Sequence, residues 1–137
     1  MIFELTDEQK LVQETAREFA HNDIAPTLKE EEKNHEFRLD RVARMGELGF
    51  FSCAVPEELG GTGFGFMESV LMAEQVAKVS ASWRLPFNLQ NLGPALTVAK
   101  FGTEAQRHKF IPGWVAGTQI GFFGMTEPES GSDVASM

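Results

Sequence analysis

Two stretches of this sequence carry residues whose types and order could do chemistry, and the longer one lies at its C-terminal end. Residues 120–125, Ile-Gly-Phe-Phe-Gly-Met, place bulky apolar side chains around glycines, which predicts a strand. Pro128 lacks an amide donor, so such a strand has to leave its sheet there. Residues 129–133, Glu-Ser-Gly-Ser-Asp, then form a polar turn with hydroxyls and exposed amides. Gly124 and Gly131 would let a flat ring and a phosphate come close to the main chain.

The second stretch is Trp83-Arg84-Leu85, which places an arginine after a predicted helix and among apolar residues. Burying an unpaired guanidinium is costly, and the nearest acidic residue in the sequence is Glu74. A guanidinium fork can also bind a carboxylate through two parallel hydrogen bonds. Residue types alone therefore leave three interpretations open: a structural ion pair, a side chain that reaches to solvent, and a binding site for a carboxylate.

Helices must position both stretches, because most of the chain shows apolar residues at helical spacing. Thr6 and Gln9 form a capping box at the start of the first helix, and Thr103 caps the last one. Gly49 is placed to end the third helix in a left-handed conformation. The sequence predicts helices over residues 6–22, 26–34, 39–48, 66–79, 89–101 and 104–116.

Three further segments connect or flank these helices. Residues 50–55 are short and apolar, which predicts a buried connector that includes Cys53 as a small hydrophobic residue. Residues 56–65 are rich in glycine, but their spacing differs from that of a nucleotide-binding loop, so we expect a turn between helices. Residues 29–33, Lys-Glu-Glu-Glu-Lys, predict a solvated helix face.

Composition excludes several classes of function. The net charge is −8 and basic residues do not cluster, which argues against nucleic acid or an anionic membrane as the main partner. With one cysteine, the chain has no disulfide framework, and we expect no metal site. No apolar run approaches the roughly 18 residues of a membrane span. Because a capped helix begins almost directly after Met1, we expect no leader peptide and a cytoplasmic location.

Residues 123–133 resemble the flavin-binding signature of the acyl-CoA dehydrogenases, in which Thr-Glu-Pro-x-x-Gly-Ser-Asp crosses the FAD. The resemblance extends back to Thr6, and Pro-Glu-Glu-x-Gly-Gly-x-Gly at residues 56–63 is similar to a turn of that family's helical domain. It implies a fold: an all-α N-terminal helical domain at residues 1–118, running into the first strand of a middle β-domain at residues 119–137 that is mostly absent. The chain would then be the N-terminal third of a longer enzyme.

The resemblance also implies the cofactor and its site. Members of the family use FAD to oxidise an acyl-CoA to its 2,3-enoyl-CoA, and they pass the electrons to an electron-transfer flavoprotein. Their catalytic glutamate lies in a C-terminal domain, so we expect no catalytic residue in this chain, and we expect a homotetramer at full length. Thr126 and nearby amides would face the pyrimidine end of the flavin, and Ser132 would lie near the phosphates of FAD and the acyl-CoA tail. The implied cofactor-binding residues are Phe123, Gly124, Met125, Thr126, Glu127, Pro128, Glu129, Ser130, Gly131 and Ser132.

Arg84 narrows the expected substrate. Counted from Phe101-Gly102, it falls where glutaryl-CoA dehydrogenases hold the arginine that grips the distal carboxylate, and Gln90 and residues 103–107 match the same subgroup. The resemblance therefore implies a dicarboxylic acyl-CoA monothioester as substrate, with Arg84, Leu85 and Ser132 as substrate-binding residues.

Two departures from that subgroup bear on the reaction. Ala77 and Leu85 stand where the decarboxylating members carry a glutamate and a serine, so we expect no decarboxylation. Leu85 and Phe87 would leave room for a ring, as in a benzylsuccinyl-CoA-type enzyme. An ordinary short- or medium-chain acyl-CoA dehydrogenase with a structural Arg84 also remains open, as does a helical binding module without catalysis.

Overall fold

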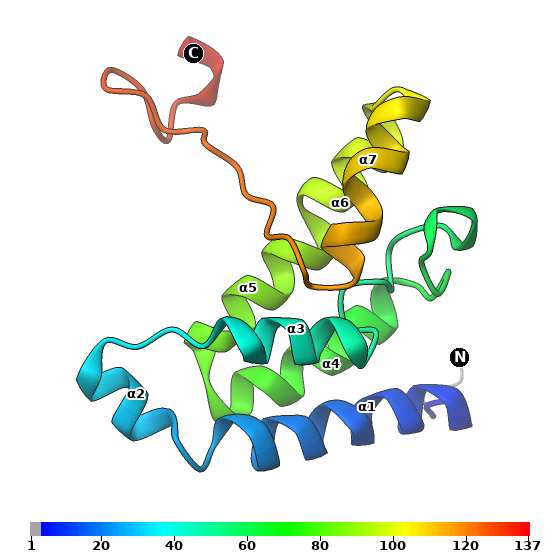
Figure 1. Cartoon of the computed structure of the whole chain (residues 1–137), viewed down its shortest axis with the longest axis vertical. Coiled ribbons are helices and arrows are strands. Elements are labelled where there is room, and N and C mark those ends of the chain that lie inside the picture. Colours follow the sequence, from blue (N-terminus) through cyan, green and yellow to red (C-terminus); the bar gives the residue numbers. More distant parts are fainter. Residues whose placement is uncertain (1–3) are drawn as a thin grey trace.

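The computed structural model describes residues 4–137, with only the backbone described at Ser136, and its regular structure is helical throughout (Figure 1). The first three residues, on which the expectation about a leader partly rests, lie outside this range. The helices are α1 (Asp7–Phe19), α2 (Leu28–Asn34), α3 (Leu39–Glu47), α4 (Phe66–Val79), α5 (Ala81–Leu92), α6 (Pro94–Phe101) and α7 (Glu104–Val115). A π-helical turn η1 (Ala20–Ile24) continues α1, and η2 (Glu57–Leu59) and η3 (Val134–Ser136) are single 3₁₀ turns.

The predicted helix starts are confirmed where local hydrogen bonds define them. The Thr6 hydroxyl accepts from the Gln9 amide at 3.1 Å, and the Gln9 side chain accepts from the Thr6 amide at 3.1 Å. Thr103 and Gln106 repeat the same capping box at α7. Such a pair satisfies two donors that the first helical turn would otherwise leave unbonded.

The core forms where α4 packs against both α1 and α5. Phe50, from the connector that follows α3, lies at its centre: its ring meets Phe19 of α1 edge-on at 5.2 Å and Phe87 of α5 at 6.2 Å. The connector 50–55 is buried as predicted, and Cys53 with it. A smaller apolar cluster beneath α6 and α7 is built on Val55, Ala95 and Ile111.

Two of the predicted elements are wrong. The single helix over 89–101 is in fact the end of α5 and the whole of α6, because Gly93 breaks the helix and Pro94 starts the next one. The strand over 120–125 is absent from the described part of the chain, whose only β-type pairing is the bridge between Glu127 and Ser130. The chain instead leaves the end of α7, passes α5 and then extends away from the helices (Figure 1).

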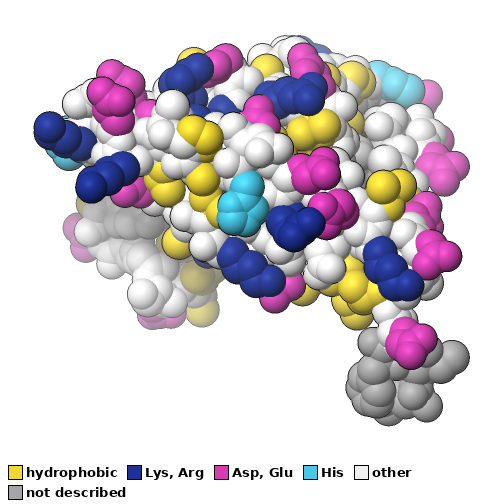
Figure 2. Space-filling model, turned by 90° about the horizontal axis from the view of Figure 1, so that it is seen from below, with side chains coloured by type: hydrophobic (Ala, Val, Ile, Leu, Met, Phe, Trp, Pro, Cys, Tyr) yellow, Lys and Arg dark blue, Asp and Glu magenta, His cyan; other side chains and the backbone are white. Residues whose placement is uncertain are grey.

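The surface is mixed in charge. Figure 2 shows one face on which basic and acidic side chains are interspersed, with apolar residues between them. No helix among residues 4–137 is both long and apolar enough to cross a bilayer.

Candidate functional site

Arg84 follows a helix, α4, as predicted, but it also lies inside the next helix, α5, whose first part the sequence did not predict. Ser80 caps α5 by accepting from the Trp83 amide at 3.2 Å, and the helix begins at Ala81, three residues before Arg84. The Arg84 side chain is half-buried, and it makes no ion pair or hydrogen bond with any other residue that the structure describes. A helix therefore holds its backbone while its guanidinium keeps its donors available.

Trp83, the residue before Arg84, is held by contacts of its ring with two other side chains. The Phe37 ring lies 5.0 Å from the Trp83 ring at an interplanar angle of 13°, and the Arg41 guanidinium lies 4.6 Å from the ring centroid. An arginine over an indole face is attracted by the ring quadrupole. These contacts fix the first turn of α5 against α3 and the loop before it.

The arginine that stacks on Trp83 belongs to a buried ion pair. Arg41 Nη1 and Nη2 donate to the Glu31 carboxylate at 2.6 and 2.8 Å, and Nη2 also donates to the Thr27 hydroxyl at 3.0 Å. The hydrogen bonds from Arg41, and then from Thr27, hold the pKa of Glu31 below its usual value. Glu31 is buried, whereas the other four residues of 29–33 are exposed, so the solvated face predicted there is confirmed except at Glu31.

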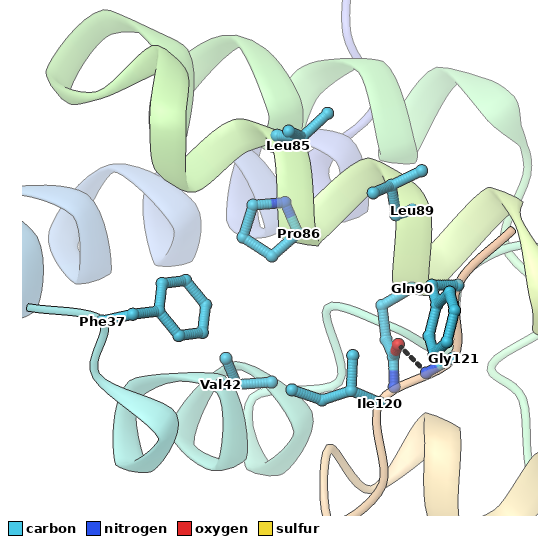
Figure 3. A pocket seen from close by; sticks show the side chains of 9 residues that line it. Phe37, Val42, Leu85, Pro86, Leu89, Gln90, Ile120 and Gly121 are labelled. Carbon is cyan, nitrogen blue, oxygen red and sulfur yellow. Dashed lines mark hydrogen bonds between the residues drawn. The ribbon is translucent and has the colours of Figure 1, made fainter. Parts of the chain in front are cut away.

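An apolar cavity of about 250 Å³ lies on another side of α5 (Figure 3). Its walls come from three parts of the chain: α5, the region of α3, and the segment after α7. Of the predicted substrate residues Leu85 lines it, whereas Arg84 does not, and Phe87 is fully buried in the core. The lining residues are Phe37, Val42, Leu85, Pro86, Leu89, Gln90, Ile120, Gly121 and Phe122.

Gln90, near the end of α5, joins this helix to the segment that follows α7. Its Nε2 donates to the carbonyls of Trp114 at 3.0 Å and Gln119 at 2.5 Å, and its Oε1 accepts from the Gly121 amide at 3.0 Å, the contact drawn in Figure 3. The side chain is only 3% exposed. All three bonds go to backbone, so Gln90 determines the path of the chain at residues 119–121.

The residues predicted to bind FAD, 123–132, are continuous and almost entirely exposed. The amides of residues 122–126 donate no hydrogen bond to another described residue, and Phe123 and Met125 expose about half of their side chains. A Cβ added at Gly124 would meet nothing within 4 Å. Available amides, apolar side chains and an open backbone approach suit a flat, hydrogen-bonding ring system, so this segment fits one wall of a flavin site.

The turn after Thr126 holds its own shape. The amides and carbonyls of Glu127 and Ser130 exchange hydrogen bonds of 2.8 and 3.3 Å, and the Ser130 hydroxyl donates to the Asp133 carbonyl at 2.6 Å. Gly131 leaves its backbone open, with Thr126 Cγ2 3.8 Å from where a Cβ would lie. Ser132 is exposed on this turn.

Sequence reasoning missed the roles of two residues that organise the site. Arg41 lies one turn before the buried Met45 on α3, so its place on the inward face was readable from helical spacing. Gln90 had no comparable signal as a connector, because its three partners lie 24, 29 and 31 residues further along the chain.

Comparison with known proteins agrees with this architecture. Residues 6–118 match the family described as acyl-CoA dehydrogenase, N-terminal domain. The glutaryl-CoA dehydrogenase of Desulfococcus multivorans is 36% identical over 140 residues, which cover 100% of this chain and 36% of that protein.

Solved structures lead to the same group. A glutaryl-coenzyme A dehydrogenase in complex with glutaryl-CoA superimposes with a TM-score of 0.95 at 36% identity, covering 100% of this chain and 35% of that one. An acyl-CoA dehydrogenase complexed with FAD from Bacillus anthracis gives a TM-score of 0.87 at 30% identity, covering 98% of this chain and 23% of that one. The chain thus spans about a third or less of the length of these relatives. By its sequence and its helical fold, it belongs to the acyl-CoA dehydrogenase family.

Proposed function

We propose that the protein containing this chain catalyses the FAD-dependent α,β-dehydrogenation of a dicarboxylic acyl-CoA monothioester of the glutaryl-CoA type, without decarboxylation. The observation that carries this substrate class is the half-buried Arg84, whose guanidinium has no partner among the described residues. A distal carboxylate on the substrate would supply the missing counter-charge. The relative that binds glutaryl-CoA has the same fold over the whole of this chain.

The side chains around Arg84 fit the clamp but not a decarboxylating site. Asn88 is half-buried one helical turn further on, so it lies on the same face of α5 and offers a second donor to a carboxylate. Ala77 is exposed on α4 and Leu85 lines the apolar cavity, so neither adds a polar group beside the carboxylate. Ser132 is the remaining proposed contact to the acyl-CoA.

FAD is the proposed cofactor, and residues 123–132 are its proposed wall within this chain. When bound, it would accept the hydride removed from the acyl group. The exposed amides of residues 122–126 and the Thr126 hydroxyl would donate hydrogen bonds toward the pyrimidine end of the ring system, where negative charge appears on reduction. Gly131 and Ser132 would lie beside the phosphates.

The remaining elements of the proposal follow from family membership. Residues 1–118 form the helical domain and residues 119–137 begin the middle β-domain. An electron-transfer flavoprotein is the proposed electron acceptor, and the full-length protein is proposed to be a homotetramer. The catalytic glutamate is expected outside residues 1–137.

A substituted succinyl-CoA, such as benzylsuccinyl-CoA, is the second candidate substrate. The observation that favours it is the apolar cavity of about 250 Å³, which Leu85, Phe37 and Phe122 line beside the turn that carries Arg84. A cavity of this size has room for one aromatic ring. Both candidates share the carboxylate that Arg84 would bind, so the substrate assay should include both.

The test is Arg84→Ala in the full-length protein, assayed with glutaryl-CoA, benzylsuccinyl-CoA and the monocarboxylic pentanoyl-CoA. Truncating one member of a buried charge pair typically costs about 2–5 kcal/mol, which corresponds to roughly 30- to several-thousand-fold in kcat/KM. We expect that loss for the preferred dicarboxylic substrate and no loss for pentanoyl-CoA. Arg107→Ala is the matched control, because Arg107 is also a half-buried arginine, on α7. Equal losses with all substrates would make Arg84 structural and refute the dicarboxylate assignment.

A further inference from the structure

Helix α5 carries the proposed substrate clamp near one end and a buried amide near the other. Gln90 follows Arg84 by six residues, which is about 9 Å along a helix axis. Both polar atoms of its carboxamide form hydrogen bonds: Nε2 donates to two backbone carbonyls, and Oε1 accepts from the Gly121 amide. The Gly121 bond is the last hydrogen bond before the exposed amides of residues 122–126. Gln90 therefore holds the chain at the point where the proposed cofactor wall begins.

Steric contacts also hold the chain at Gly121. A Cβ at Gly121 would lie 2.7 Å from Pro94 Cβ and 3.2 Å from Trp114 Cε2, so the backbone fits between these two side chains only because the residue is glycine. Gly93, at the break between α5 and α6, leaves similar room for the Phe123 ring, whose Cε2 would lie 3.0 Å from an added Cβ. The segment is thus seated against the α5–α6 junction over residues 119–123.

We propose that Gln90 is a positioning residue for the cofactor. It fixes where residues 123–132 leave the helical domain, and so it fixes the cofactor wall relative to Arg84 on the same helix. Phe123, the first residue of that wall, is two residues from Gly121, which limits its reach from the Gln90 bond to about 7 Å. This inference rests on the proposed function, since it requires that residues 123–132 bind FAD.

The physical effect of the contact is preorganisation. A segment whose exit is already held loses less conformational freedom when a ligand binds to it, so affinity rises without any direct contact between the holding residue and the ligand. Without the Gln90 bonds, the Gly121 amide and two carbonyls lose their partner, and residues 119–123 can take other paths. Loss of the Gln90 hydrogen bonds should therefore weaken the binding of the cofactor as well as lower the stability of the fold.

Asn91, the next residue, provides a matched control. It is also fully buried, but its carboxamide donates to the Ser69 hydroxyl of α4 at 3.0 Å and accepts from the Ala54 amide at 3.5 Å. It therefore ties α5 to the helical core and not to the segment after α7. Gln90→Met and Asn91→Leu each replace a buried carboxamide on α5 with an apolar side chain of similar size, and only the first releases the proposed cofactor wall.

The experiment measures the dissociation constant of FAD in the full-length protein after the flavin is removed and titrated back, together with the melting temperature of the flavin-free form. We expect both variants to melt lower than wild type, and Gln90→Met alone to bind FAD at least about 10-fold more weakly. Gly121→Ala is the second variant, used if Gln90→Met does not fold. It displaces the segment from the side of Pro94, and we expect the same weakening.

Two outcomes would overturn the proposal, and they can be told apart. If the Gln90 and Asn91 variants lose FAD affinity equally, or neither loses any, Gln90 supports the fold and does not position the cofactor, while the proposed function stands. If the wild-type protein itself binds no FAD, both the proposed function and the proposed role of Gln90 are wrong.

Discussion

The buried pair of Glu31 and Arg41 allows a quantitative prediction. Their side chains are only 6% and 5% exposed, and Arg38 lies near the same carboxylate, with its Nη1 3.6 Å from Glu31 Oε1. Glu31→Gln would keep the shape of the site and remove its negative charge. Leaving one member of a buried pair uncompensated typically costs about 3–5 kcal/mol. Because Arg41 keeps its contact with the Trp83 ring, worth about 1 kcal/mol, we expect the lower end, about 3 kcal/mol.

Native-state hydrogen exchange of the α3 amides measures this cost in the full-length protein without requiring a single unfolding transition. A loss of about 3 kcal/mol corresponds to roughly 100-fold faster exchange through local opening. Glu47→Gln is the matched control. Glu47 lies on α3, the helix whose amides are measured, and its 2.9 Å ion pair with Arg44 is exposed. Exposed pairs contribute about 0–1 kcal/mol, so we expect at most about fivefold faster exchange there.

A second substitution tests the reasoning about the uncompensated charge. Replacing both partners, as Glu31→Leu with Arg41→Met, removes the lone cation, and exchange in α3 should return close to the wild-type rate. If Glu31→Gln exchanges no faster than Glu47→Gln, the pair does not hold α3 in place. If the α3 amides of the double variant exchange as fast as those of Glu31→Gln, the loss of stability comes from packing and the electrostatic argument is wrong.

Three further predictions concern single groups. Burial raises the pKa of the Cys53 thiol to about 11, so iodoacetamide at pH 8 should alkylate it only after unfolding, as mass spectrometry would show. Arg41 lowers the pKa of Glu31 in the folded state, so the ionised Glu31 should stabilise the fold fully above pH 4.5. This stabilisation should decline as the pH falls below 4.5, and melting temperatures measured across pH would show it. Thr126→Val should remove about 0.5–1.5 kcal/mol of preference for reduced flavin. Spectroelectrochemistry should then show a potential lowered by about 10–30 mV, and an unchanged potential would mean that the hydroxyl points elsewhere.

Features fixed by short-range contacts could be read from the sequence. The capping boxes at Thr6 and Thr103 each depend on a partner three residues away, and both are present. Helix α4, which follows Gly65, begins and ends where its pattern predicted, at residues 66 and 79. The signature at residues 123–133 identified the family because its residue order is characteristic, although the strand expected at its start is not formed in the described chain.

Features that depend on distant partners could not be read. Glu31 looked solvated because its neighbours in sequence are charged, and its partner Arg41 lies ten residues away on another helix. No helix was predicted over residues 81–88, although Ser80 was available as the cap of α5. A strand at residues 120–125 requires a neighbouring strand to bond with.

Pro86 also affects how α5 can respond to a substrate. As a proline within the helix, it has no amide to donate to the Ser82 carbonyl, so the helix lacks the backbone hydrogen bond that would span the turn bearing Arg84. The turn bearing Arg84 is held instead by the Ser80 cap and by the Phe37 ring stacked on Trp83. This missing bond makes the turn that bears Arg84 more compliant than the turn that bears Gln90. A small bend there would let the guanidinium follow carboxylates on acyl groups of slightly different length while the flavin wall stays in place.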